Sequence, residues 1–516
     1  MMRRIDTDVL VIGSGFGGSP AALRLARAGL RVVLVEKGPR INPYRDFRQT
    51  QDPQYLLKYI RGMAGNNLNL TYAEALGGGS GFYEMVSLRA PRKAFVQRDQ
   101  ASRRLWPEGV DRDRLDPFYD VGERKLNVEQ IDPALVPKSG LVFASMMKNL
   151  GYSCERARYA VRGCLGSGFC VTGCIYGAKQ SLLLNYIPQA ESAGATVETD
   201  LEALYVKPLS RLLPDRSGAL PTTPVRYEVV CRSTEDGAQK TVFRTKLLIL
   251  ASGTVGTAKL LLQSRRFFRH LSRQTGRNIA FNGAVKVAGL LPDGFPEGDM
   301  FTGRSHPGMI SYEFLESRGV TISAAKPMPL QVLASVRLRL DGDGPRPLHW
   351  GRDHVELMKQ YRRRMMVLVA FGMTPPGGEI RHLHGDSFSL DLDVDDSLRT
   401  YYEETKELLN GILSRNGCRL VYAEFVDHEG RPYDDIHFST SHQVGSCRMA
   451  DDARRGTCNA DGEIFGNPGL YITDGSAIPT SLAVNTSLTI LANAERIVSN
   501  IVRRYCEDRA ITRSAA

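Results

Sequence analysis

A glycine-rich turn between an apolar segment and a helical one, near the amino terminus, constrains this chain more than any other feature. Residues 8–12 read Asp-Val-Leu-Val-Ile, which is typical of a buried parallel strand. The pattern G-x-G-x-x-G follows at 13–18, and helical apolar spacing then continues to a stop at Gly29. A second strand is predicted over 31–35. This order predicts a Rossmann-like βαβ unit that binds a dinucleotide.

The residues of this unit have separate physical tasks. Gly13 permits the tight turn, Gly15 lets a pyrophosphate approach the backbone, and Gly18 lets the helix pack closely on the strand. Phe16 belongs to the same turn, where unpaired N–H groups and the positive end of the helix dipole face the phosphates. Glu36 ends the second strand, where its carboxylate can accept hydrogen bonds from ribose hydroxyls. These residues alone do not distinguish FAD from NAD.

Composition excludes several other classes of protein. The 516 residues are 42% apolar and 24% charged, as in globular enzymes of two or three structural units. Asp6 and Asp8 interrupt the segment after Arg3-Arg4, and no run of about 18 apolar residues occurs, so we expect no signal peptide, no integral membrane segment and a cytoplasmic protein. The odd count of nine cysteines argues against a disulfide framework.

The formal net charge of +11 has two interpretations. The densest basic group lies at 359–364 and is typical of a solvated helix face. The alternative is attraction of an anionic substrate or an acidic carrier protein. No motif for nucleic-acid binding accompanies the charge, so we expect no nucleic-acid partner.

Three later glycine turns suit the same kind of ligand. The first is a glycine run whose backbone N–H groups can approach a phosphate or an isoalloxazine edge, at Gly78, Gly79 and Ser80. The second follows a strand predicted over 247–251 and precedes a helix over 255–262, at Ala251, Ser252 and Gly253. The third follows a strand over 469–473, at Asp474 and Gly475. Asp474 can bind ribityl or phosphate-bridging groups there, or can form an ordinary Asp-Gly turn.

The segment 284–439 differs from its surroundings. It has no phosphate loop and many short β-like runs, at 286–291, 332–340, 364–371 and 388–392. This pattern predicts a second, sheet-based domain that covers the ligand and forms a substrate pocket.

The motifs and their order resemble the glucose–methanol–choline (GMC) oxidoreductases, in the bacterial branch that includes cholesterol oxidase. The resemblance rests on Gly13 to Glu36, Gly77 to Ser80, Gly173 to Lys179, Leu248 to Gly253, Phe371 to Pro375, His442 to Arg448, and Asp474 to Asn485. It implies FAD as the cofactor and an α/β fold with a discontinuous Rossmann-like FAD-binding domain, built from 1–283 and 440–516. It also implies an α+β substrate-binding domain on a mostly antiparallel sheet over 284–439.

The resemblance assigns roles to individual residues. His442 matches the active-site histidine of the family, and Asn485 matches the second catalytic position. The implied contacts to FAD are Gly13, Gly15, Phe16, Gly18, Glu36, Gly78, Gly79, Ser80, Tyr83, Val206, Ala251, Ser252, Gly253, Asp474, Gly475, Thr486 and Ser487. Tyr83 stands where many relatives have Asn, and proline commonly occupies the positions of Gln443 and Thr486.

The function that we expect is oxidation of an alcohol on a small molecule, with hydride transfer to flavin N5 and His442 as the base. Asn485 would orient the hydroxyl or cap the helix predicted over 487–505. The electron acceptor is O₂ or an unknown one. The alternatives are a desaturase or tailoring enzyme that acts on a C–C or C–N bond, a redox-neutral FAD lyase, and a binding protein without turnover.

No metal site is predicted. His382 and His384 lack a third ligand at a recognisable spacing. Cys164, Cys170 and Cys174 have the spacing of an iron–sulfur run with one ligand missing, so a structural role is the main interpretation and a cluster the alternative.

Overall fold

In the computed structural model, strand β1 (Arg3–Ile12) forms the centre of the first sheet. It begins five residues before the segment predicted from the sequence, and Thr7 to Ile12 are buried. Parallel neighbours flank it on both sides, β2 (Val32–Val35) and β11 (Lys240–Leu250). A strand covered on both faces needs a continuous apolar run, which is why 8–12 do not alternate. The structure describes residues 3–50, 52–213, 220, 223–299, 306–326, 337–341, 351–424 and 436–507.

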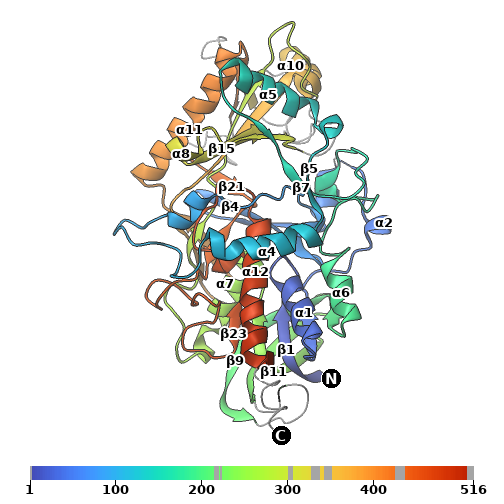
Figure 1. The fold of residues 1–516 in the computed structure, drawn as a ribbon, viewed down its shortest axis with the longest axis vertical. Coiled ribbons are helices and arrows are strands. Elements are labelled where there is room, and N and C mark those ends of the chain that lie inside the picture. The colour runs from blue at the N-terminus through green and yellow to red at the C-terminus, as the bar shows by residue number, and fades with distance from the viewer. Residues whose placement is uncertain are drawn as a thin grey trace.

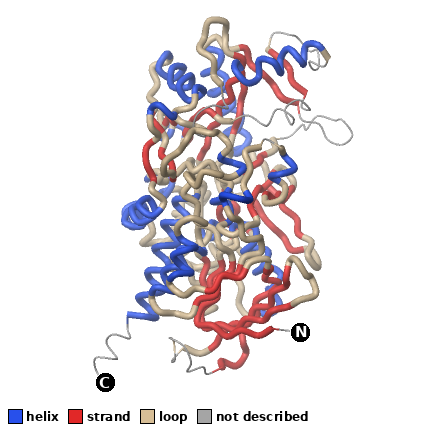
Figure 2. The backbone as a smooth tube through the Cα atoms, turned by 90° about the vertical axis from the view of Figure 1, so that its right-hand side faces the viewer, coloured by secondary structure: helices blue, strands red, loops and turns tan. Residues whose placement is uncertain are grey.

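The first sheet has the order β8-β2-β1-β11-β10-β9, with β23 (Leu470–Ile472) beside β11. β8 (Thr196–Glu198) and β23 are parallel to their neighbours, whereas β9 (Leu201–Leu213) and β10 (Val225–Ser233) form an antiparallel meander. Its helices are α1 (Gly18–Arg27), α4 (Arg112–Lys125), α6 (Tyr186–Ser192), α7 (Gly253–Ser264) and α12 (Ser487–Val502). This half confirms the Rossmann-like fold, and Figures 1 and 2 show it in the lower part of the molecule.

The second sheet is antiparallel throughout and lies in the upper part of Figure 1. Its order is β16 (Arg337–Leu340), β20 (Arg419–Glu424), β13 (Val285–Leu290), β17 (Met365–Gly372), β15 (Val320–Ala324), β14 (Met309–Ser311) and β6 (Glu155–Arg156). The helices α5 (Lys138–Asn149) and α11 (Asp396–Arg415) contribute to its buried core, and α8 (Leu315–Arg318) and α10 (Arg352–Arg364) lie near it. The expected antiparallel second sheet is confirmed.

Most of the predicted strands of this half are present, with shifted ends. β19 (Phe388–Leu392) spans the expected residues, and β13 begins one residue early. β17 begins at Met365, because Arg364 still belongs to α10. Of the run 332–340, only 337–340 lies within the described residues, as β16. The domain boundaries stay a prediction, since α5 and β6 precede residue 284 and yet pack with the second sheet.

Two smaller sheets connect the halves. One consists of β3 (Ile60–Ala64), β4 (Leu68–Ala73) and β21 (Phe438–Thr440), and the other of β12 (Arg277–Ala280), β18 (Gly378–His382), β19 and β22 (Val444–Ser446). β5 (Val128–Gln130) and β7 (Arg158–Ala160) form a separate pair. The residues between β21 and β22 therefore lie where both halves meet, and His442 is one of them.

The basic group on α10 is paired with acids. The ion pairs are Lys359–Glu356 at 2.7 Å, Arg362–Asp299 at 3.4 Å, Arg363–Glu297 at 3.6 Å and Arg364–Asp293 at 2.8 Å. This arrangement is that of a solvated helix face. Among the described helices, none combines the length and apolar character required to cross a lipid bilayer.

Candidate functional site

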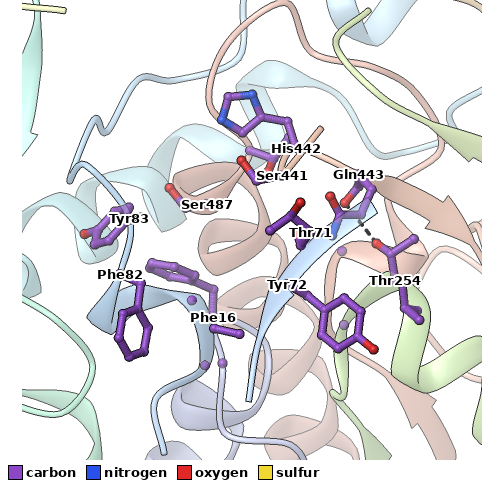
Figure 3. Close-up of a pocket in the computed structure, with 18 of the residues that line it drawn as sticks. Phe16, Thr71, Tyr72, Phe82, Tyr83, Thr254, Ser441, His442, Gln443 and Ser487 are labelled. Atoms are coloured by element: carbon purple, nitrogen blue, oxygen red, sulfur yellow. Dashed lines mark hydrogen bonds between the residues drawn. The ribbon is translucent and has the colours of Figure 1, made fainter. Parts of the chain in front are cut away.

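A cavity of about 910 Å³ lies between the glycine turns of the first sheet and one face of the second sheet. Its walls come from the carboxyl ends of β1 and β11, from the turn after β23, and from β13, β15 and β17. Ligands of open α/β sheets bind at such carboxyl ends, and this volume suits a large organic ligand. Figure 3 shows Phe16 and Phe82 on one part of the wall and His442 on another.

The glycine turn at 13–18 is packed against the turn that follows β11. A Cβ added to Gly13, which has φ +98°, would lie 2.3 Å from the carbonyl oxygen of Ala251. One on Gly18 would lie 1.8 Å from the carbonyl oxygen of Gly13, which accounts for the close helix–strand packing expected there. Gly15 differs, because no atom lies within 4 Å of its added Cβ. Its open side faces the cavity, which it lines.

Backbone N–H groups at this turn are available to donate hydrogen bonds to a ligand. Within the described part of the chain, the N–H groups of Gly15 and Phe16 have no hydrogen-bond partner. They lie just before α1, where the positive end of the helix dipole adds to the attraction for an anion. The turn therefore fits a pyrophosphate.

Glu36 lines the cavity at the end of β2 and is held by its neighbours. Its Oε2 accepts from Ser14 N at 3.0 Å and from Ser14 Oγ at 2.6 Å, and its Oε1 accepts from Gly38 N at 3.0 Å. Burial raises the pKa of Glu36, whereas these hydrogen bonds lower it. Ser14 Oγ also accepts from Gly77 N at 2.8 Å. Ser14, which was not predicted as a site residue, thus connects the first turn, Glu36 and the Gly77 run.

Asp474 connects the turn after β11 with the turn after β23. Its Oδ2 accepts from Gly253 N at 2.7 Å and from Thr257 Oγ1 at 2.6 Å, and its Oδ1 accepts from Ser476 N at 2.9 Å. Asp474 lines the cavity, and its carboxylate also holds α7 and the segment after β23 together through these hydrogen bonds.

We expect Asp474→Asn to lower the free energy of unfolding by about 1–3 kcal/mol, because one acceptor is replaced by an NH₂ group among buried donors. Urea unfolding of the FAD-loaded protein measures the change. Asp6→Asn, at an exposed position of β1, is the matched control. If Asp474→Asn loses no more free energy of unfolding than Asp6→Asn, these hydrogen bonds of Asp474 do not stabilise the fold.

His442 lies between two asparagine side chains. Asn485 Nδ2 is 3.0 Å from Nε2, and Asn282 Nδ2 is 3.3 Å from Nδ1. The Asn282 amide is fixed, since its Nδ2 donates to Val484 O at 2.7 Å and its Oδ1 accepts from Leu482 N at 3.2 Å. Donors on both sides cannot satisfy the two N–H groups of an imidazolium, so this environment favours the neutral ring.

Neighbouring residues also hold the His442 segment in place and shift the pKa of its ring. Phe371 meets it edge-on, with ring centroids 4.9 Å apart. Thr254 Oγ1, on α7, donates to the backbone oxygen of Gln443 at 2.9 Å, as the dashed line in Figure 3 shows. Burial, and to a smaller extent the nearby ammonium of Lys286, lower the pKa of His442 to about 4. The imidazole is therefore neutral at physiological pH.

Most of the predicted site residues meet in this cavity. Its lining includes His442, Asn485, Gly13, Gly15, Phe16, Glu36, Gly78, Gly79, Tyr83, Ala251, Ser252, Gly253, Asp474, Gly475, Thr486 and Ser487. Three predicted residues lie behind the lining. Gly18 packs on Gly13, Ser80 Oγ accepts from Leu182 N at 3.1 Å, and Val206 N donates to Ser264 Oγ at 2.9 Å. At β9 the cavity contacts Leu201, Glu202 and Ala203 instead.

The donor and acceptor set of the cavity fits FAD. The Tyr83 hydroxyl and Gln443 Oε1 are buried on its wall without a hydrogen-bond partner among the described residues. Burial raises the pKa of Tyr83, so its phenol stays neutral. Gly78 approaches Gly15 so closely that its added Cβ would lie 3.1 Å from Gly15 Cα. Open glycine backbone, free N–H groups and unpartnered polar atoms are what a bound dinucleotide with a flavin ring requires.

Cys164, Cys170 and Cys174 line a separate space of about 10 Å³. Lys179 connects this loop to the cavity, since its Nζ donates to Gly81 O at 2.9 Å, Tyr83 O at 2.8 Å and Cys170 O. No group of His, Cys, Asp and Glu able to hold a metal ion occurs in the portion that the structure describes. These contacts are those of a structural loop.

Three strand–turn–helix segments around one cavity, closed by an antiparallel sheet, define a dinucleotide-dependent oxidoreductase of two structural halves. The sequence profile of the amino-terminal part of GMC oxidoreductases matches residues 7–278, and that of the carboxyl-terminal part matches 392–494. The chain belongs to the GMC oxidoreductase family, whose cofactor is FAD.

Similar proteins extend over nearly the whole chain. A cholesterol oxidase of Mycobacterium tuberculosis is 27% identical, covering 96% of this chain and 91% of its own length. A long-chain-alcohol oxidase of Arabidopsis thaliana is 24% identical, covering 97% of this chain and 68% of its own. The solved structure of a formate oxidase from Aspergillus oryzae has a TM-score of 0.66 at 14% identity, covering 98% of this chain and all of that one. The last likeness concerns the fold alone.

Proposed function

We propose that this protein oxidises an alcohol group of a small molecule to a carbonyl, with His442 as the proton acceptor. The observation that carries the proposal is the contact between His442 Nε2 and Asn485 on the cavity wall. FAD, when bound, supplies the acceptor for the hydride that leaves the alcohol carbon. The chemical balance is one hydride and one proton lost from the CH–OH group, which becomes C=O.

His442, Asn485 and Asn282 have different roles in this reaction. Neutral His442 takes the hydroxyl proton at Nε2, the nitrogen beside Asn485, while Nδ1 lies 3.3 Å from the amide nitrogen of Asn282. Asn485 orients the hydroxyl through its amide without adding a charge. Asn282 is a positioning residue that keeps the ring from turning. Positioned proton transfer of this kind contributes about 10²–10⁴ in rate.

The alcohol oxidases among the similar proteins support this reaction class. An anaerobic screen of alcohols for bleaching of the bound flavin tests it directly. Bleaching with formation of a carbonyl product supports the proposal, and subsequent mixing with O₂ tells whether O₂ is the electron acceptor. Product formation without bleaching would instead indicate a redox-neutral reaction, and bleaching without a carbonyl product would indicate attack on a C–C or C–N bond.

The pKa of His442 predicts the pH dependence of this step. A base works in its neutral form, which dominates above its pKa of about 4. The second-order rate constant for flavin reduction should therefore rise with pH through about 4 and be level from about pH 5. The protein is kept in neutral buffer and mixed rapidly into acidic buffer, so that stopped-flow records flavin reduction before the protein unfolds. The rates at successive pH values then give the rising part of the profile. A rise in rate centred near the ordinary histidine pKa of 6.5 would contradict the lowered pKa of this ring.

A further inference from the structure

One face of the second sheet forms the cavity wall opposite the glycine turns. In the antiparallel register, Lys286 of β13 pairs with Val369 of β17, Val369 with Ser323 of β15, and Ser323 with Ile310 of β14. All four residues line the cavity. Because side chains alternate between the faces of a strand, Ala284 and Phe371 share this face with them and also line the cavity. Lys286 is thus the charged member of an otherwise uncharged surface.

The ammonium group of Lys286 has no ion pair or hydrogen bond to any residue that the structure describes. Two other lysines of the cavity have such partners, and Lys259 lies over the ring of Phe388, 5.0 Å from its centroid. Lys37 pairs with Glu74 at 2.9 Å and with Glu202 at 3.2 Å, and Lys326 Nζ donates to Gly168 O at 2.7 Å. Burial lowers the pKa of Lys286, and the charge of Glu84, which also lines the cavity, opposes that change. The Lys286 side chain is exposed to the cavity, so an anion that enters can approach its ammonium group and pair with it.

We propose that the substrate carries an anionic group, a carboxylate or a phosphate, which Lys286 binds while the reacting hydroxyl lies against His442 and Asn485. This inference rests on the proposed alcohol oxidation. It names the class of substrate for the same site. The surface beside Lys286, formed by Val369, Ser323 and Ile310, then contacts the uncharged part of the substrate.

The charge of Lys286 also bears on the proton transfer. His442 must accept a proton during turnover, and the neighbouring ammonium opposes this. An anionic group paired with Lys286 offsets that opposition in the complex. A charged substrate therefore gains in the rate of flavin reduction as well as in binding.

The test compares hydroxy acids of increasing length, and phosphate monoesters of diols, with their neutral methyl esters in anaerobic flavin reduction. We expect the best anion to exceed its ester in second-order rate constant by about 10- to 100-fold, the usual contribution of a hydrogen bond to a charged group. Lys286→Met should abolish this ratio, and Lys286→Arg should largely retain it. Lys148→Met, on the exposed side of α5, removes one charge elsewhere and should keep the wild-type ratio.

A second measurement does not depend on turnover. Titration with acetate, pentanoate and inorganic phosphate should perturb the flavin spectrum of the wild type at concentrations about tenfold or more below those for Lys286→Met. If neutral esters reduce the wild type as fast as the acids, or if Lys286→Met keeps the ratio, the anionic class is wrong while alcohol oxidation stands. If no alcohol reduces the flavin, the proposed alcohol oxidation is wrong. The anion site is refuted separately if the same anion concentrations perturb the flavin spectrum of the wild type and of Lys286→Met.

Discussion

Replacing His442 by alanine is expected to slow anaerobic flavin reduction at least about a hundredfold, the lower end of the range for a positioned acid–base group. The loss follows because the hydroxyl proton then has no neutral acceptor beside Asn485, while the CH–OH group cannot release hydride readily with its proton in place. FAD should stay bound, since the contacts around Gly15 and Glu36 are unchanged. Stopped-flow bleaching gives the rate, and the visible spectrum of the purified variant gives the FAD content.

Two further variants make this test specific. His384→Ala alters an exposed histidine outside the cavity lining and should reduce its flavin at the wild-type rate. Asn282→Ala removes the amide that holds the ring without removing the base, so its loss should be smaller than that of His442→Ala. Bleaching of His442→Ala at the wild-type rate would sink the role of this residue as the base.

Replacing Gly15 by valine is expected to produce a folded protein that binds FAD about 10- to 100-fold more weakly. No protein atom lies within 4 Å of an added Cβ, so the fold accommodates the side chain. The branched side chain instead occupies the space through which a pyrophosphate reaches the free N–H groups, and such overpacking costs about 1–3 kcal/mol. Ultrafiltration of the reconstituted apoprotein gives the dissociation constant of FAD.

The control for Gly15→Val is Gly237→Val, at a turn that also has open space and lies outside the cavity lining. Gly13→Ala provides the opposite extreme. Its Cβ would meet backbone at 2.3 Å, so that variant should lose thermal stability as well as FAD. Gly15→Val that binds FAD as tightly as the wild type would show that the phosphates lie elsewhere.

Much of the first half could be predicted, because its information is local. A strand, a glycine turn, a helix and a terminal acid follow one another within 8–36, and each step has its own steric or electrostatic requirement. The start of α12 at Ser487 was likewise predicted, although its α-helical part ends at Val502 and a π-helical turn, Arg503–Glu507, follows. Local patterns predict elements well and their last residues less well.

The register of distant strands could not be predicted. No local pattern in the sequence tells which residues of β9 reach the cavity. Its first residues, including Ala203, lie there, whereas Val206 lies against α7. Similarly, α5 and β6 joined the second sheet although they precede the predicted boundary at 284. Pairing between segments far apart in the chain depends on packing that no local window contains.

The sequence by itself determined the dinucleotide turns and the order of motifs that ends in His442 and Asn485. Only the tertiary structure decided that Asn282 faces the ring of His442, that Ser14 links Glu36 to the Gly77 run, and that Lys286 stands unpaired in the cavity. The physical reason is that glycine turns and capped helices depend on neighbours in the chain. The charge and hydrogen-bond environment of a side chain depends instead on which residues the folded sheets bring beside it.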